Sequence, residues 1–510
     1  MNASQLRVTK ETLIRCCTAL DTTFEQSVEK DFVLPDYCPD VFRILKCRVI
    51  PRVTSQSING GRMTVDTEAV IKVMYLSEGN GRVNLLEQKL SFTRSFELPK
   101  ECISPSVNAV PRLEYVNCRV ISQRRVDVRG AFSVRVKVTG EERSQFITDA
   151  QGCNVQLLRR QTSYPAKRLT AAKRITVVED LELGGAKPPV GAVLRTACRF
   201  EQQEQKIIQG KLITKGEATV DLLYTPAESE ALSIEAMRFG LPYSQIIDID
   251  GIDESYTVNI DIISAGCEII PKPNAPEQLE CELVMLVSCE AYKYESCEAV
   301  TDAFSTVYAY STEQCGFDIG GTPVWQNESF RLEGTLNSTG EEIASIASAW
   351  CETGSVSVRG SDGKSVVSGS ITMSAIGSDI TGTAIYLENE LPFEYELEGG
   401  TCEDAEAFVT DCSYHLADGN TVEIKADIAV KALSSDAGRI IPLSGLEIDE
   451  NTVEKPSDGY ALKLCAVSAG ETLWDIAKRC RTSIKAIIEE NDLTSDKTEE
   501  SGMLLIPLIN

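Results

Sequence analysis

The sequence contains a single histidine, His415, and no Cys-x-x-Cys pair among its eighteen cysteines. Structural zinc sites combine closely spaced cysteines with histidines, so this composition argues against a metal centre. The cysteines are scattered singly, apart from Cys16 and Cys17, and lack the dense spacing of a secreted disulfide scaffold. We therefore expect reduced, mostly buried thiols, with no bound metal and no cofactor.

Long apolar runs are also missing. No stretch of about 18 apolar residues occurs, so we expect no membrane insertion. Residues 1–17 do not combine a basic start with an apolar stretch, and we expect no secretory signal peptide.

Few residues offer catalytic chemistry. A Ser-His-Asp or Cys-His site would have to be built around His415, and no nucleophile motif lies near it. Residues 360–365 resemble the end of a phosphate-binding loop, but Val358 occupies the position of the required first glycine. We expect no catalytic residues. Carboxylates are so abundant that a glycosidase-like pair stays open as an alternative.

Charge is unevenly distributed along the 510 residues. The formal net charge is −26, yet residues 1–175 hold 28 Lys and Arg against 18 Asp and Glu. Such polarity is an argument about association, and it suggests a basic end that meets an acidic surface, such as a second copy of this chain. Assembly of that kind should be sensitive to salt. Basic pairs such as Arg159-Arg160 lack interleaved aromatic residues, so we expect no nucleic-acid partner.

Three segments of the chain resemble one another. Residues 62–75, 211–224 and 364–377 each alternate apolar and polar positions after a glycine-containing turn, which is typical of a β-hairpin. A step of about 150 residues is too long for a solenoid repeat, so each unit should close its own core. Short helices are expected at 39–46, 188–195 and 341–348, where proline or an acidic residue precedes apolar positions.

These patterns predict a mainly β protein. We expect three consecutive, related, antiparallel domains of sandwich or barrel type, followed by a small C-terminal βααβ domain. The predicted domains span residues 1–160, 161–300 and 301–440, the third being degenerate. A linker is expected at 441–459, where proline, glycine and serine gather, and the last domain at 460–510.

Residues 465–507 resemble a LysM module. The string from Cys465 to Arg479, the segment 491–495 and the closing Leu-Leu-Ile-Pro at 504–507 carry the resemblance. It implies binding, without cleavage, of an N-acetylglucosamine-containing glycan or of a protein. Two loops, 469–473 and 491 to about 498, would form the site, which gives these candidate residues: Gly470, Glu471, Thr472, Leu473, Asn491, Asp492 and Leu493.

Other LysM positions have structural interpretations or depart from the usual pattern. Thr472 should cap the first helix, Gly470 should adopt a conformation that other residues resist, and Asn491 should bond the turn after the second helix. Arg481 occupies a position where glycine usually turns the chain, and Glu490 replaces a usual apolar residue. Acidic residues such as Glu490 accumulate at this end of the module. They weaken an apolar surface on which a sugar ring could lie, and they favour a protein partner.

Residues 31–45, which contain Pro35, Pro39 and Asp40, resemble the SPOCS domain of spore coat morphogenetic proteins from endospore-forming clostridia. The string weakens to residues 186–194 in the second unit and is nearly lost in the third. The resemblance implies a non-enzymatic coat scaffold in the mother-cell cytoplasm, at the forespore surface. Its LysM module would dock a coat-building ATPase, and its β units would assemble with one another or with coat proteins. The alternative is a peptidoglycan-binding protein of the cell wall or spore cortex.

Overall fold

The computed structural model describes residues 5–78, 82–98, 103–227, 233–319, 323–340, 342–361, 364–398, 401–435, 439–454, 461–493 and 501–507. Antiparallel strands form most of these residues, and the two described helices lie close to the C-terminal end. The predicted mainly β fold class is therefore confirmed.

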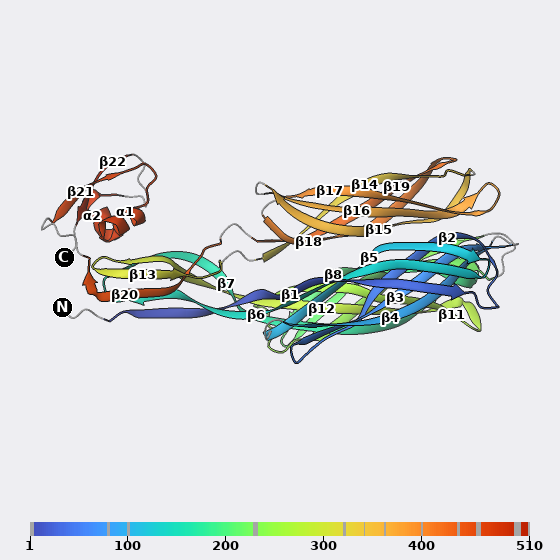
Figure 1. Ribbon diagram of the computed structural model, residues 1–510, viewed down its shortest axis with the longest axis horizontal. Helices are drawn as coiled ribbons and strands as arrows, with labels where there is room; N and C mark the ends of the chain where they lie inside the picture. Colours follow the sequence, from blue (N-terminus) through green and yellow to red (C-terminus); the bar gives the residue numbers. More distant parts are fainter. Residues whose placement is uncertain are drawn as a thin grey trace.

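Three repeats of six strands share one topology (Figure 1). In each repeat the first, sixth and fifth strands form one sheet, and the second, third and fourth form the other. The two sheets enclose a separate apolar core in each repeat. The strands are β1(Arg7–Val33), β2(Val41–Asn59), β3(Arg62–Ser77), β4(Val83–Glu97), β5(Ile103–Ser122), β6(Arg125–Gln151); β7(Val155–Glu182), β8(Val190–Ile208), β9(Lys211–Pro226), β10(Glu235–Asp248), β11(Thr257–Lys272), β12(Ala275–Ser305); and β14(Pro323–Asn337), β15(Ile343–Ser361), β16(Lys364–Asp379), β17(Ala384–Leu397), β18(Thr401–Asp418), β19(Thr421–Ser435).

A stalk extends from the sandwiches and is built by all three repeats. We define it as the start of β1 with the end of β6, the start of β7 with the end of β12, and the pair β13(Tyr308–Gln314) and β20(Leu443–Val453). Apolar side chains from these pairs form two clusters in its interior, one around Phe146 and one that contains Val300 and Leu446. Figure 1 shows the stalk leading away from the sandwiches towards the chain termini.

The structure divides the repeats differently from the sequence-based boundaries. Strand β7 runs through residue 160 and β12 runs through residue 300, so the divisions fall at 152–154 and 306–307. The predicted linker at 441–459 contains β20, which pairs with β13, so the third repeat extends to Val453. Pro442 and Ser444 lie at the start of this strand, and the rest of the predicted linker, 455–459, lies outside the described residues.

The helices predicted at 39–46, 188–195 and 341–348 are wrong, because these segments start strands β2, β8 and β15. Near its start each strand has two irregularities in register, three residues apart, at Val41/Arg43 and Ile44/Lys46 in β2 and at equivalent places in β8 and β15. A bulge adds one residue to the alternation of a strand. Apolar residues then recur every third position, which imitates the spacing of a helix.

The proline string has a structural role in the first two repeats. The hydroxyl of Tyr75 donates to the carbonyl of Pro39 at 3.2 Å, and that of Tyr224 donates to Pro188 at 2.9 Å. Both rings are buried, and burial raises the pKa of each phenol to about 12. In the third repeat the aligned position is Gly377, which explains why the proline string is not needed there.

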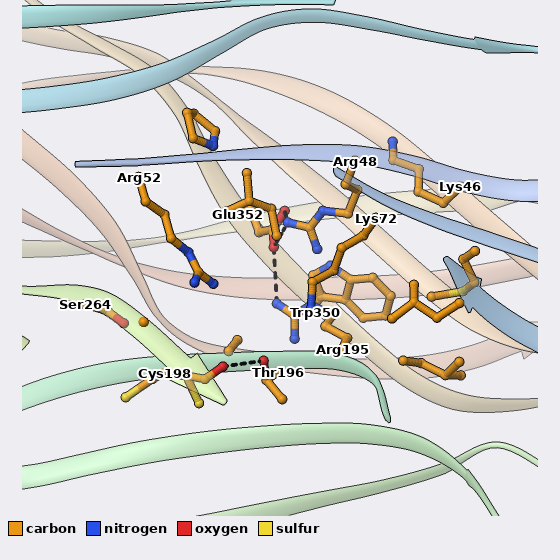
Figure 2. Close-up of a pocket in the computed structure, with 18 of the residues that line it drawn as sticks. Lys46, Arg48, Arg52, Lys72, Arg195, Thr196, Cys198, Ser264, Trp350 and Glu352 are labelled. Atoms are coloured by element: carbon orange, nitrogen blue, oxygen red, sulfur yellow. Dashed lines mark hydrogen bonds and ion pairs between the residues drawn. The ribbon is translucent and has the colours of Figure 1, made fainter. Parts of the chain in front are cut away.

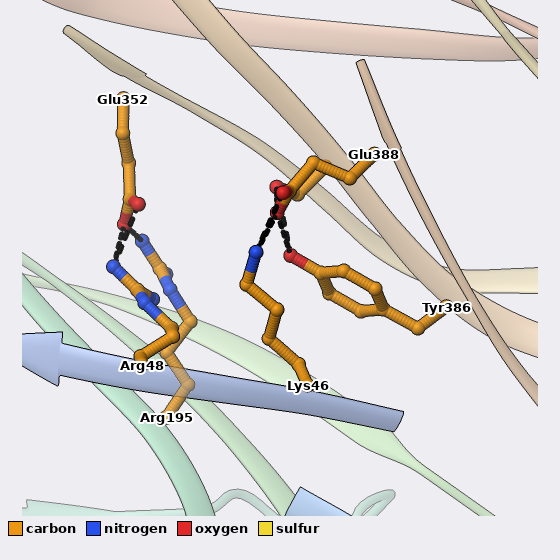
Figure 3. Close-up of polar contacts among 7 residues, drawn as sticks. Lys46, Arg48, Arg195, Glu352, Tyr386 and Glu388 are labelled. Carbon is orange, nitrogen blue, oxygen red and sulfur yellow. Dashed lines mark hydrogen bonds and ion pairs between the residues drawn. The ribbon is translucent and has the colours of Figure 1, made fainter. Parts of the chain in front are cut away.

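One carboxylate joins all three repeats. Glu352 of β15 accepts hydrogen bonds from Arg48 of β2 at 2.6 Å and from Arg195 of β8 at 3.2 Å (Figure 3). Beside it, Lys46 pairs with Glu388 of β17 at 2.5 Å, and the hydroxyl of Tyr386 donates to the same carboxylate. Apolar side chains from each repeat, including Met74, Leu194 and Trp350, pack around these pairs.

The charge of Glu352 depends on its partners. Burial alone would raise the pKa of this carboxyl, but the guanidinium groups of Arg48 and Arg195 outweigh that effect and hold the pKa below its usual value. A depressed pKa stabilises the folded state at pH values above the ordinary glutamate range, and the contribution is lost as the pH falls.

We expect Glu352→Gln to lower the free energy of unfolding by about 2 kcal/mol, because two guanidinium groups lose their shared charged acceptor while partial hydration limits the loss. The matched control is Glu333→Gln, which removes an exposed partner of Lys425 and should cost under about 0.5 kcal/mol. Urea unfolding measures both.

The difference between wild type and Glu352→Gln should shrink as the pH falls from about 5 towards 3, as Glu352 becomes protonated. A difference that stays constant over that range would contradict the assigned role of the charge.

Candidate functional site

The C-terminal domain has the predicted βααβ order. Strands β21(Leu462–Val467) and β22(Gly502–Pro507) pair, and between them lie α1(Leu473–Cys480) and α2(Ile484–Asn491). Ile476, Ala477, Ile487 and Ile506 are fully buried in its core. Ile484 and Ile488 pack against them from one face of α2.

The first predicted loop is held mainly by its own contacts. Gly470 is exposed and has a φ of +81°, a conformation that glycine adopts easily. The Glu471 carboxylate accepts from the Ser468 amide and pairs with Arg479 at 2.9 Å. Thr472 caps α1 by accepting from the Asp475 amide, as predicted, and Leu473 is buried in the core.

The second predicted loop is similar. The Asn491 amide donates to the carbonyls of Ile487 and Leu505 and accepts from the Leu505 amide, so it ties α2 to β22. Asp492 is exposed at the end of α2 with a φ of +51°, and Leu493 is partly buried. The remainder of the predicted loop, 494–498, lies outside the described residues.

The first loop follows β21, and the second loop precedes β22. Because β21 and β22 pair, the two loops begin and end at neighbouring strands. The amide of Ala469 donates to the hydroxyl of Ser501 at 3.0 Å, which links the turn before α1 with the residue before β22. Of the seven predicted residues, Gly470 and Asp492 are exposed, and the other five are partly or fully buried.

A second surface of this domain was missed by sequence reasoning: α1 is docked on the end of the stalk. The indole Nε1 of Trp474 donates to Asp302 of β12 at 2.8 Å, and Lys478 pairs with the same carboxylate at 2.7 Å. The Trp474 ring meets Phe304 edge-on, with centroids 5.0 Å apart. An aromatic contact and a shared charged acceptor therefore fix the position of α1.

Arg481 explains one departure from the LysM pattern. It turns the chain with a φ of +55°, where glycine would be unstrained. Its guanidinium donates to the carbonyls of Tyr308 at 3.1 Å and Ser305 at 3.5 Å, and it pairs with Glu454. The unusual residue was a visible signal, but its partners lie at the ends of the second and third repeats and could not be identified from local sequence.

Other candidate chemistry is sparse. His415 is exposed on β18, opposite Glu423. Within the described ranges, no group of three His, Cys, Asp or Glu side chains could hold a metal ion. Across the same residues, no helix is both long and apolar enough to cross a membrane.

Comparison with protein families gives two matches. The family model described as "SipL, SPOCS domain" matches residues 40–121 and 189–270, and the LysM domain model matches residues 466–504. No curated protein and no solved structure matches the chain significantly. The chain therefore combines two copies of the SPOCS domain with a C-terminal LysM domain, which confirms the resemblance to both families.

Both SPOCS matches begin at the proline string and end on the fifth strand of a repeat. The matched domains are non-catalytic binding modules. They support a sporulation-related, spore-associated protein that carries a peptidoglycan-binding type of module.

Asp302→Ala should release the LysM domain from the stalk, because it removes the acceptor shared by Trp474 and Lys478. We expect at least a several-fold faster proteolytic cut between the third repeat and the LysM domain, with the thermal midpoint of the main β transition little changed. Glu298→Ala on the same strand is the control, since Glu298 is exposed and weakly paired with Arg159 at 3.9 Å. Equal cleavage rates in both variants would contradict the docked arrangement.

Proposed function

We propose that this chain is a non-enzymatic scaffold of the spore coat, in which the LysM domain docks a protein on the forespore surface and the β repeats mediate assembly. The observation that carries the proposal is the position of the LysM domain. It is docked at the end of the stalk, so the LysM domain lies apart from the three sandwiches (Figure 1). Such a geometry suits an adaptor that connects two layers.

The residues of the two predicted LysM loops support a protein partner. The Leu473 side chain is buried and Glu471 is engaged by Arg479, so neither offers an apolar shelf for a sugar ring. Exposed groups near the second loop are acidic: Glu489, Glu490 and Asp492. A protein with a complementary basic surface would be steered to this end of the molecule. The coat-building ATPase implied by the SPOCS resemblance is the first partner to test.

Glycan binding is the second candidate, and the LysM match favours it. The two loops that hold the seven predicted residues would then contact N-acetylglucosamine units of peptidoglycan through their exposed positions and their backbone polar groups. The two candidates differ in what they retain: a purified protein or an insoluble glycan.

The deciding experiment measures binding of the full chain to the purified coat-building ATPase and to purified peptidoglycan. Asp492→Asn removes the charge while keeping a residue that tolerates the left-handed conformation. We expect about a fivefold or greater loss of ATPase affinity with this variant, because a charged contact is worth about 1 kcal/mol or more. Asp250→Asn, in an exposed turn of the second repeat, should change nothing.

Retention on peptidoglycan alone would contradict docking to a protein and favour the glycan-binding candidate. Unchanged ATPase affinity in Asp492→Asn would show that the partner uses another surface.

Strand β5 supports the proposed assembly role. It is an outer strand of its sheet and exposes a series of apolar side chains: Ile103, Val110, Leu113, Tyr115, Val120 and Ile121. Exposed apolar residues on an edge strand form a surface suited to association between chains. The strand also belongs to the basic first repeat, which can meet the acidic surface of a second copy.

Val110→Lys should shift sedimentation of the concentrated full chain towards the monomer, because Val110 is central in β5 and half-exposed. Ile263→Lys is the matched control on β11, the corresponding strand of the second repeat, which exposes only Ile263 and Ile270 among its large apolar side chains. If both variants associate as the wild type does, β5 is not the assembly surface.

A further inference from the structure

A cavity of about 250 Å³ lies where the three repeats meet (Figure 2). Strands from all three repeats line it, with β2 and β3 from the first, β8 and β11 from the second, and β15 and β17 from the third. No sequence motif pointed to this place, because its residues come together only through packing of the repeats.

The lining of the cavity is strongly cationic. Five basic side chains face one carboxylate, that of Glu352; the basic residues are Lys46, Arg48, Arg52, Lys72 and Arg195. Lys46 and Lys72 have partners outside the lining, Glu388 at 2.5 Å and Glu87 at 3.0 Å. A further carboxylate, that of Glu268 on β11, pairs with Lys89 at 2.6 Å and also attracts Arg52 and Lys72. With Glu388, Glu87, Glu268 and Lys89 all included, six positive charges meet four negative ones.

The arginines account for the excess. Arg48 and Arg195 share Glu352, so one carboxylate serves two guanidinium groups. Burial lowers the pKa of Arg195, and the neighbouring Arg48 lowers it further. Arg52 forms no hydrogen bond or ion pair with any described residue. Figure 2 shows its guanidinium directed into the same space as the ends of Lys72 and Arg195.

Two buried donors at the cavity also lack acceptors within the part of the chain that the structure describes. They are Nε of Arg195 and the indole Nε1 of Trp350. Trp350 is only 7% exposed. The Arg195 guanidinium lies over the Trp350 ring, 4.6 Å from its centroid, so both donors belong to one cluster. Buried donors without acceptors cost free energy, and an anion would satisfy them.

We propose that this cavity binds a compact multivalent oxyanion of the phosphate type. Arginine guanidinium groups present paired N–H donors that match the oxygens of phosphate, and lysine adds a point charge. The volume suits a free phosphate or one small phosphate ester. Arg52, Lys72 and Arg195 are the primary ligands, while Glu352 keeps Arg48 and Arg195 in position.

Binding at this place couples the ligand to the arrangement of the repeats. Arg52 and Lys72 belong to the first repeat, Arg195 belongs to the second, and Glu352 fixes it to the third. The anion therefore binds the assembled repeats and not the separated ones, so it stabilises their packing by mass action.

Titration calorimetry of the full chain with inorganic phosphate, at constant ionic strength set with sodium chloride, tests the site. We expect one phosphate per chain, and about a tenfold or greater loss of affinity in Arg52→Gln, since a charge-assisted bond contributes about 1.5–3 kcal/mol. Arg331→Gln is the matched control, because it removes an exposed arginine that pairs with Asp427 in the third repeat. This control should bind phosphate as the wild type does.

Thermal unfolding of the same proteins separates ligand binding from folding. Without phosphate, Arg52→Gln should melt close to the wild-type temperature, because Arg52 forms no ion pair and Glu268, which attracts it, keeps its pair with Lys89. With phosphate, the wild type should gain stability that the variant does not gain. Equal gains in both would show a general salt effect and overturn the site, as would absence of calorimetric binding to the wild type.

Discussion

The carboxylate of Glu352 is the point on which the arrangement of the repeats depends. Each sandwich closes its own core, so each could exist apart from the others. Glu352 accepts from Arg48 of the first repeat and from Arg195 of the second, which makes three separate domains meet at one place. A partly buried carboxylate between two guanidinium groups is specific in its geometry, since losing either side leaves a charge without its partner.

The same junction uses part of the charge polarity of the chain. Basic side chains of the first repeat, Lys46 and Arg48, pair with acidic side chains of the third, Glu388 and Glu352. Part of the asymmetry is therefore used within one molecule. The acidic end of the LysM domain keeps its charge for contacts with other molecules. The exposed apolar side chains of β5 are also available to them. The excess of arginine at the junction also creates the proposed anion site, which exists only when the three repeats are packed together.

Sequence reasoning succeeded where the signal was local. Alternating apolar positions predicted the hairpins, and Thr472, Gly470 and Asn491 predicted the caps and turns of the LysM domain. The prediction of short helices was wrong because a bulge adds a residue and changes the spacing of apolar positions in a strand, as in β2 around Val41 and Ile44. It also could not find contacts between distant segments. Neither the stalk, the docking of Trp474 on Phe304, nor the cluster around Arg195 leaves a pattern in any single stretch of sequence.

A scaffold of this kind acts through fixed distances between its binding surfaces, so its shape in solution is the most direct test. Small-angle X-ray scattering of the full chain should fit one elongated particle, with the three sandwiches at one end and the LysM domain against the stalk at the other. The profile should keep that shape at physiological salt. Scattering typical of four independently moving domains would contradict the central role of the Glu352 junction and of the docked LysM domain.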